Sequence, residues 1–309
     1  MHQIKGIYCA SVTPFNSDYS INKQLLLQHC NYLLSENVEG IAIFGTTGEA
    51  NSLSQNEKLD AINYLIDNNI EPKKLLPGTG LNSIKDTISF TKAMAKLNVR
   101  GVLVLPPSYY KNISSQGIVD FYSRVVEGVE ETNLHYLLYH FPQMSSLNID
   151  LNVIEKLILK YPNNIVGIKD SSGDIDNMLK MIKTFENFAV FSGSDSLALK
   201  VMKNGGAGAI TAVSNISASL LSFIVKNWKE ESSISKFSEI QKLQEEIRSN
   251  VFHYQPISSI KAFMATQYNN PEWNRLLPPL VSLQDPSNNS IVISLIELIK
   301  KMKELLSDS

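Results

Sequence analysis

The chain has 309 residues, of which 43% are apolar and 19% charged, with a formal net charge of −2 at pH 7. This is enough for one large barrel or for two domains of ordinary globular composition. Basic residues form no stripe, and no apolar run approaches the ~20 residues that span a bilayer, so we expect neither a nucleic-acid partner nor a membrane partner.

Runs of apolar, often β-branched residues alternate with helix-period stretches along most of the chain. The first helix-period stretch, 21–34, places Leu26, Cys30 and Leu33 on one face, and the second, 56–66, follows the capping pattern of Ser54 and Glu57. Ser114 or Ser115 and Asp150 are predicted caps of later helices. The candidate strands are 6–15, 40–45, 75–79, 102–106, 135–141, 165–171, 189–194 and 207–213.

Eight strands separated by helices over about 230 residues predict a (β/α)8 TIM barrel. An open doubly wound sheet also alternates, but it usually carries a glycine-rich phosphate fingerprint, which this chain lacks. The run Gly205-Gly206-Ala207-Gly208 is more typical of a helix C-cap and a tight turn than of a phosphate loop.

After about residue 230 the strand runs stop and helical patterns continue, at about 234–248, 258–267 and 291–306. We therefore predict two domains. Residues 1–230 form the catalytic barrel, and residues 231–309 form a C-terminal helical domain. The two cysteines, Cys9 and Cys30, cannot form a disulfide framework, and no secretory signal is visible, so we expect a cytoplasmic protein.

A lysine, Lys169, ends the apolar run Ile165-Val166-Gly167-Ile168. Burial lowers the pKa of an ammonium group, and the neutral amine is a nucleophile for carbonyl carbons. A lysine at a strand end can also extend its ammonium group to solvent. The pattern thus leaves open a Schiff-base lysine and an ordinary surface lysine.

Other strand ends add polar groups, because active sites of such barrels lie at the carboxyl ends of the strands. Gly45-Thr46-Thr47-Gly48-Glu49 follows the second strand, and its hydroxyls and backbone N–H groups could hold a carboxylate or simply form a capped turn. Tyr139 lies one strand before Lys169. It could pass protons to an adduct on that lysine, or be an aromatic core residue.

The positions of the arginines and histidines favour neither a metal site nor an arginine that binds the substrate carboxylate. None of the four arginines, Arg100, Arg124, Arg248 and Arg275, lies at a predicted strand C-terminus. A substrate carboxylate would therefore rest on hydroxyl and backbone donors. The five histidines do not cluster at metal-ligand spacing, so we expect no metal, and His140 is a predicted wall residue of the pocket.

Four motifs stand out together: residues 45–49, the segment 106–110 that ends in Tyr109-Tyr110, Tyr139-x-x-Pro142 and Gly167-Ile168-Lys169-Asp170. In their order and spacing they resemble the dihydrodipicolinate synthase/N-acetylneuraminate lyase superfamily of class I pyruvate-dependent aldolases, and the resemblance covers nearly the whole chain. It implies a (β/α)8 barrel with a C-terminal helical domain, a homotetramer built as a dimer of dimers, and no cofactor other than a pyruvate imine on Lys169.

The resemblance also implies a role for single residues. Tyr139 would transfer protons, and Thr46 and Thr47 would bind the pyruvate carboxylate and link the tyrosines. Tyr110 would be offered to the active site of a neighbouring subunit. The residues implied on the side of the second substrate are Gly193, Asp195 and Ile210, and Ser171 could donate to a substrate hydroxyl.

Two departures bear on the substrate. Met144 stands where dihydrodipicolinate synthases have an arginine for the carboxylate of the aldehyde, which removes a contact of roughly 1.5–3 kcal/mol, or about ten- to hundredfold in affinity. Ala212 aligns with a serine of sialic acid lyases. The stretch 169–174 resembles instead aldolases for 2-keto-3-deoxy sugar acids or 4-hydroxy-2-oxoglutarate.

We therefore predict a Schiff-base class I aldolase or lyase that condenses pyruvate with an aldehyde, or cleaves the product back to both. The favoured substrates are of the 2-keto-3-deoxy sugar acid or 4-hydroxy-2-oxoglutarate type. One alternative is 4-hydroxy-tetrahydrodipicolinate (dihydrodipicolinate) synthase, which condenses pyruvate with aspartate semialdehyde. The other is a barrel that binds 2-oxo acids without turnover.

Overall fold

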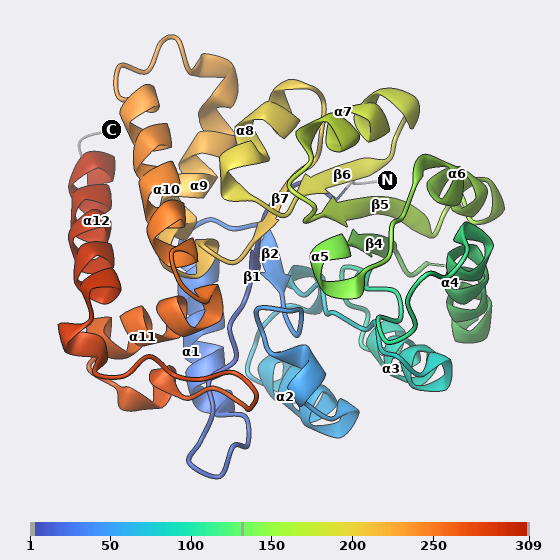
Figure 1. Cartoon of the computed structure of the whole chain (residues 1–309), viewed down its shortest axis with the longest axis horizontal. Coiled ribbons are helices and arrows are strands. Elements are labelled where there is room, and N and C mark those ends of the chain that lie inside the picture. Colours follow the sequence, from blue (N-terminus) through green and yellow to red (C-terminus); the bar gives the residue numbers. More distant parts are fainter. Residues whose placement is uncertain (1–3, 131–132, 308–309) are drawn as a thin grey trace. The chain divides into compact units, whose positions relative to one another are not determined.

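A computed structural model of the chain describes residues 4–130 and 133–307 (Figure 1). By its contacts the chain divides into two compact units, and each unit combines separate stretches of sequence. Unit 1 consists of Glu71–Ile210 and the start of the chain, and unit 2 consists of Gly6–Ile70 and Thr211–Ser309. The boundary predicted near residue 230 stays a prediction.

Unit 1 is a run of parallel strands in which each strand pairs with the next one along the chain. The strands are β3 (Val102–Val104), β4 (Tyr136–His140), β5 (Ile165–Asp170), β6 (Ala189–Ser192) and β7 (Gly208–Thr211). Between them lie α4 (Ser115–Val129), α5 (Pro142–Ser145), α6 (Leu151–Lys160), α7 (Ile175–Thr184) and α8 (Asp195–Lys203), while η2 (Pro72–Lys74) and α3 (Ile84–Lys96) precede β3. Every residue of β3 and β4 is buried, as expected for parallel strands covered on both faces.

Unit 2 combines both ends of the chain. Strands β1 (Gly6–Ala10) and β2 (Gly40–Ala42) pair in parallel. The helices of the first stretch are α1 (Lys23–Ser35), η1 (Ala50–Ser52) and α2 (Gln55–Asp67). Those of the second are α9 (Ser214–Asn227), η3 (Trp228–Glu230), α10 (Phe237–Phe252), α11 (Pro256–Gln267), η4 (Pro271–Asn274), η5 (Pro286–Asn288) and α12 (Ser290–Ser307), with α10 beside α12 (Figure 1).

The order of elements confirms the predicted (β/α)8 TIM barrel with a C-terminal helical region. The predicted third strand, 75–79, is reduced to a parallel bridge between Gly78 and Leu103, and Thr79 N donates to Leu103 O over 3.0 Å. The predicted first strand is shorter than expected and ends at Ala10. Beyond it, Val12 N donates to the Asn215 side chain, so its backbone donor is no longer available to a neighbouring strand.

Local signals in the sequence account for the helix ends. Ser54 Oγ accepts from Glu57 N, and Ser54 N donates to Glu57 Oε2, which confirms the predicted capping box. Ser114 and Asp150 cap α4 and α6 as predicted. Gly205, at a φ of +91°, ends α8 and donates from its N–H to Met202 O, so the glycine run is a helix C-cap.

Among the described residues, no helix is both long enough and apolar enough to cross a bilayer.

Candidate active site

Lys169 is the last residue but one of β5 and is buried. Only 6% of its surface is exposed, and the next residue, Asp170, is fully buried. The side chain therefore does not extend into solvent, which was the alternative that the sequence left open. An amine in this position is shielded from water, as a nucleophilic lysine requires.

Tyr139 faces Lys169 from the neighbouring strand. The two residues are direct partners in the register of β4 and β5, and Tyr139 is 4% exposed. Lys169 Nζ lies 4.4 Å from the centroid of the Tyr139 ring, within the range of a cation–π contact. The structure thus brings together the amine and the tyrosine that the sequence predicted as partners.

Backbone contacts connect the end of β5 to the strands on both sides. Ser171 N donates to His140 O over 2.8 Å, and Gly193 N donates to Asp170 O over 2.7 Å. A Cβ atom on Gly193 would overlap the Ser171 side chain, so glycine is needed for this close approach. Ser171, the predicted donor to a substrate hydroxyl, and Gly193, predicted on the second-substrate side, are therefore neighbours.

Both oxygens of the Asp170 carboxylate accept hydrogen bonds from the turn and helix that follow the lysine. Its Oδ1 accepts from Ser172 N over 2.8 Å, and its Oδ2 accepts from Asn177 Nδ2 over 2.8 Å. These bonds tie the start of α7 to the end of β5. Asp170 thus has a structural role beside Lys169.

His140 is buried at the end of β4, and its place in the wall of a substrate pocket stays a prediction. Its Nδ1 accepts from Ile149 N over 3.3 Å, so the proton of the neutral ring is on Nε2. Burial lowers the pKa of His140, and the carboxylates of Asp170 and Asp174 oppose that shift. The ring is therefore a neutral packing element at neutral pH.

The other predicted residues of unit 1 fall into an exposed group and a buried group. Tyr110 is 73% exposed in the loop after β3, where its ring meets that of Tyr109 edge-on at 5.4 Å. Asp195 is buried in the first turn of α8, and Ile210 is buried in β7. Their roles toward a substrate or a neighbouring subunit stay predictions.

Thr46 and Thr47 lie in a tight turn of unit 2, between β2 and η1. Gly48 N donates to Gly45 O, and Glu49 N donates to Thr46 O, each over 3.1 Å. Thr47 is buried and Thr46 is partly exposed. Because the turn belongs to unit 2 and Lys169 to unit 1, their convergence on one substrate stays a prediction.

A profile of the Dihydrodipicolinate synthetase family matches residues 3–297 of the chain. The chain belongs to this family. The family assignment bears out the resemblance carried by the four motifs.

Named relatives agree with the assignment. A 4-hydroxy-tetrahydrodipicolinate synthase of Listeria welshimeri is 37% identical over 213 residues, which cover 68% of this chain and 71% of that protein. The structure of the enzyme of the same name from Methylacidiphilum fumariolicum SolV has a TM-score of 0.86 at 25% identity, and covers 99% of this chain and 98% of its own.

A 2-keto-3-deoxygluconate aldolase variant of Sulfolobus solfataricus has a TM-score of 0.84 at 24% identity, with 98% of each chain covered, and this likeness concerns the fold. Synthases and aldolases thus share the barrel. This member of the dihydrodipicolinate synthetase family is a lyase, a class I pyruvate aldolase, and the alternative of a barrel without turnover is set aside.

Sequence reasoning missed a buried cation in unit 2. Lys261 is fully buried in α11 and bonds to Glu49, the last residue of the turn that carries Thr46 and Thr47. A lysine among Ile260, Ala262 and Phe263 was the available signal, because a charged residue in an apolar stretch of helix needs a buried partner.

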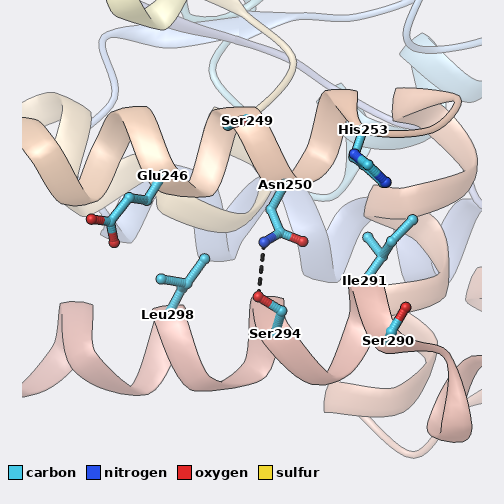
Figure 2. A pocket seen from close by; sticks show the side chains of 8 residues that line it. All are labelled: Glu246, Ser249, Asn250, His253, Ser290, Ile291, Ser294 and Leu298. Atoms are coloured by element: carbon cyan, nitrogen blue, oxygen red, sulfur yellow. Dashed lines mark hydrogen bonds between the residues drawn. The ribbon is translucent and has the colours of Figure 1, made fainter.

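A groove of about 540 Å³ lies elsewhere in unit 2, between α10 and α12 (Figure 2). Asn250 Nδ2 donates to Ser294 Oγ across it over 2.8 Å. None of the described residues that line it is a lysine, and none is among the site residues predicted from the sequence. The lining residues are Glu246, Ser249, Asn250, His253, Ser290, Ile291, Ser294 and Leu298.

Proposed function

We propose that the chain cleaves or forms a 2-oxo acid through an imine between pyruvate and the Lys169 amine. The observation that supports this most directly is the buried Lys169 amine over the face of the Tyr139 ring, 4.4 Å from its centroid. The amine is buried, and the ring that carries the phenol lies against it, which is the arrangement that a nucleophilic lysine with a proton-transferring tyrosine needs.

The proposed steps balance without a metal or an organic cofactor. Lys169 attacks the carbonyl carbon to give a carbinolamine, and Tyr139 passes protons as water leaves and the iminium forms. In cleavage, Tyr139 takes the proton of the C4 hydroxyl, the C3–C4 bond breaks, and its electron pair moves into the iminium to give an enamine and a free aldehyde. The enamine is protonated at C3 and hydrolysed to pyruvate and the free amine.

We further propose that the substrate is of the 2-keto-3-deoxy sugar acid or 4-hydroxy-2-oxoglutarate type. Met144, on α5, supplies no cation at the position where an arginine would hold the carboxylate of aspartate semialdehyde, and it is 57% exposed. Ser171 lies beside Gly193 at the end of β5 and offers a hydroxyl to a hydroxylated aldehyde.

A second candidate is 4-hydroxy-tetrahydrodipicolinate synthase activity. The relative from Listeria welshimeri carries that name at 37% identity, which favours this candidate. We also propose a cytoplasmic homotetramer in which Tyr110 reaches the active site of a neighbouring subunit, and the large exposed surface of Tyr110 supports this.

Reductive trapping tests the imine. The protein is incubated with pyruvate and borohydride, and its intact mass and peptide map are measured. We expect one reduced pyruvate on Lys169 and no label in Lys169→Met. An unmodified chain, or a label on another lysine, would overturn the assignment.

A substrate panel then separates the two candidates. Pyruvate release is measured with 2-keto-3-deoxy sugar acids and 4-hydroxy-2-oxoglutarate, and pyruvate consumption is measured with aspartate semialdehyde. We expect turnover with the first group. Comparable or faster turnover with aspartate semialdehyde would show that Met144 does not exclude it.

A further inference from the structure

Glu49 and Lys261 form a buried ion pair between the turn 45–49 and α11. Lys261 Nζ lies 2.8 Å from Glu49 Oε1, and both side chains are 0% exposed. The two residues are 212 positions apart in the sequence. The pair therefore joins the turn after β2 to the C-terminal helical region within unit 2.

Both ions make further bonds to backbone groups. Lys261 Nζ donates to Thr13 O over 2.8 Å and lies 4.3 Å from the centroid of the Phe15 ring. Glu49 Oε2 accepts from Leu277 N over 2.7 Å. The pair thus fixes three segments: the chain after β1, the turn 45–49 and the chain after η4.

A gain in stability does not account for a buried ion pair of this kind. Removing two charges from water costs several kcal/mol for each ion, and apolar residues of similar volume often stabilise a core as well or better. In some proteins a buried, hydrogen-bonded ion pair serves instead to specify one geometry for the segments that it joins. Here one of those segments is a tight turn.

The turn itself depends on these contacts. Glu49 has a φ of +56°, in the left-handed region that a residue with a Cβ atom occupies at some cost. Gly48 O accepts from Thr13 Oγ1 over 2.8 Å, and a Cβ on Gly48 would lie 3.0 Å from Ser11 O. Lys261 therefore holds both sides of a close contact, Thr13 through its carbonyl and Glu49 through its carboxylate.

We propose that Glu49 and Lys261 are positioning residues that hold the hydroxyls of Thr46 and Thr47 in the geometry for binding the carboxylate of pyruvate. This inference rests on the proposed function, in which that turn binds the carboxylate. It makes α11, which lies outside the strand–helix repeat, part of the framework of the active site.

The experiment measures pyruvate binding apart from the aldehyde partner. The half-saturating pyruvate concentration for borohydride trapping, and the trapping rate at saturation, are determined for Glu49→Gln, Lys261→Met and the double variant. We expect the half-saturating concentration to rise at least tenfold in the double variant, with the trapping rate at saturation changed less than threefold. A merely structural role would change neither quantity in a folded variant.

The double variant guards against loss of the fold, because a single variant leaves one charge buried without its partner. Circular dichroism and a melting curve show that the variant is folded. Lys23→Met is the matched control, because Lys23 pairs with Asp60 at the surface of the same unit, and it should behave as the wild type. A folded double variant with the wild-type half-saturating concentration would overturn the proposal.

Failure of the proposed function gives a different result. If wild-type protein is not labelled on Lys169, the imine assignment fails. If Thr46→Val and Thr47→Val both leave the half-saturating concentration unchanged, the turn does not bind the carboxylate. With labelling and a threonine effect both present, an unaffected double variant refutes the positioning role alone.

Discussion

At the scale of single residues, the contact between Lys169 and Tyr139 carries the chemistry that we propose. Tyr139→Phe keeps the ring beneath the amine and removes only the phenolic hydroxyl. We expect turnover to fall about 10²–10⁴-fold, the usual contribution of a general acid–base group. Tyr136→Phe, on the same strand, is the control and should stay within tenfold of wild type. Equal losses in the two variants would remove Tyr139 from the mechanism.

Met144 is the residue on which our proposal for the second substrate depends, because it carries no charge where an arginine would hold a carboxylate. In Met144→Arg we expect kcat/KM with aspartate semialdehyde to rise about ten- to hundredfold, because a guanidinium group adds a charge-assisted hydrogen bond to its carboxylate. Met144→Gln is the uncharged control and should give no such gain. A gain of the same size in both variants would mean that charge is not the cause.

His29 makes the stability of unit 2 depend on pH. Asn215 Nδ2 donates to Ala10 O and Val12 N donates to Asn215 Oδ1, so that oxygen accepts from a neutral His29 ring protonated on Nε2. Burial lowers the pKa of His29 to about 4, opposed by this hydrogen bond.

Below its ordinary pKa of about 6.5 the unfolded chain therefore binds a proton at His29 that the folded chain binds only near pH 4. Stability is thus lost as pH falls from 6.5 to about 4. Between pH 7 and pH 5, we expect the free energy of unfolding to fall by about 2 kcal/mol less in His29→Gln than in wild type. Urea titration at the two pH values measures both proteins. The same loss in both proteins would rule out His29 as the source.

At the scale of the element, β5 reaches its position because Gly167 has no side chain. A Cβ there would lie 2.8 Å from Ala189 Cβ on β6 and 2.8 Å from Leu137 Cδ2 on β4. Overpacking of this kind costs about 1–3 kcal/mol, and here it would also move the strand that carries Lys169.

We therefore expect Gly167→Ala to lower the free energy of unfolding by that amount and to slow borohydride trapping. Gly117→Ala, in α4, is the matched control. Its added Cβ meets no atom closer than 3.7 Å, and alanine favours a helix, so stability should stay the same or rise slightly. Denaturant titration measures both variants, and a stable, fully active Gly167→Ala protein would contradict the packing argument.

At the scale of the whole molecule, the two ends of the chain are joined in one unit. Asn215 Nδ2 donates to Ala10 O over 2.8 Å, and Lys261 Nζ donates to Thr13 O over 2.8 Å. Lys261, on α11 after residue 230, therefore satisfies a backbone carbonyl just beyond β1, while Asn215, on α9, satisfies the last carbonyl of β1. Without the helices after residue 230, buried polar groups and apolar faces of unit 2 would meet water.

We expect a chain shortened to residues 1–230 not to unfold cooperatively. Far-ultraviolet circular dichroism during heating would show a broad change, while the full chain shows a sharp one. A sharp transition of the shortened chain at the melting temperature of the full chain would mean that the predicted barrel domain folds alone.

The features predicted correctly from the sequence depend on residues that lie close together along the chain. The capping box of Ser54 and Glu57 spans three residues, and the glycine C-cap at Gly205 closes within four. The apolar runs of β4 and β5 were recognised in the same way. Their order along the chain made them neighbours, because consecutive strands of such a fold usually pair, and Tyr139 and Lys169 followed as partners.

Features that depend on distant parts of the chain could not be predicted in this way. The bond between Lys261 and Thr13 joins residues 248 positions apart, and the division of the chain into two units places 6–70 with 211–309. The short helix α5 also escaped prediction, although Pro142 at its first turn and the bond from Ser145 Oγ to Phe141 O account for it.

The difference has one physical origin. Hydrophobic period, caps and turns depend on groups within a few residues of one another, and these groups are visible in the order of amino acids. The partner of a buried charge depends on which segments meet after packing, since any of several carboxylates or carbonyls could satisfy it. Most of the strands and helices, and the Lys169–Tyr139 pair, were therefore accessible from the order of residues. The bonds that hold the turn of Thr46 and Thr47 became visible only once the chain was folded.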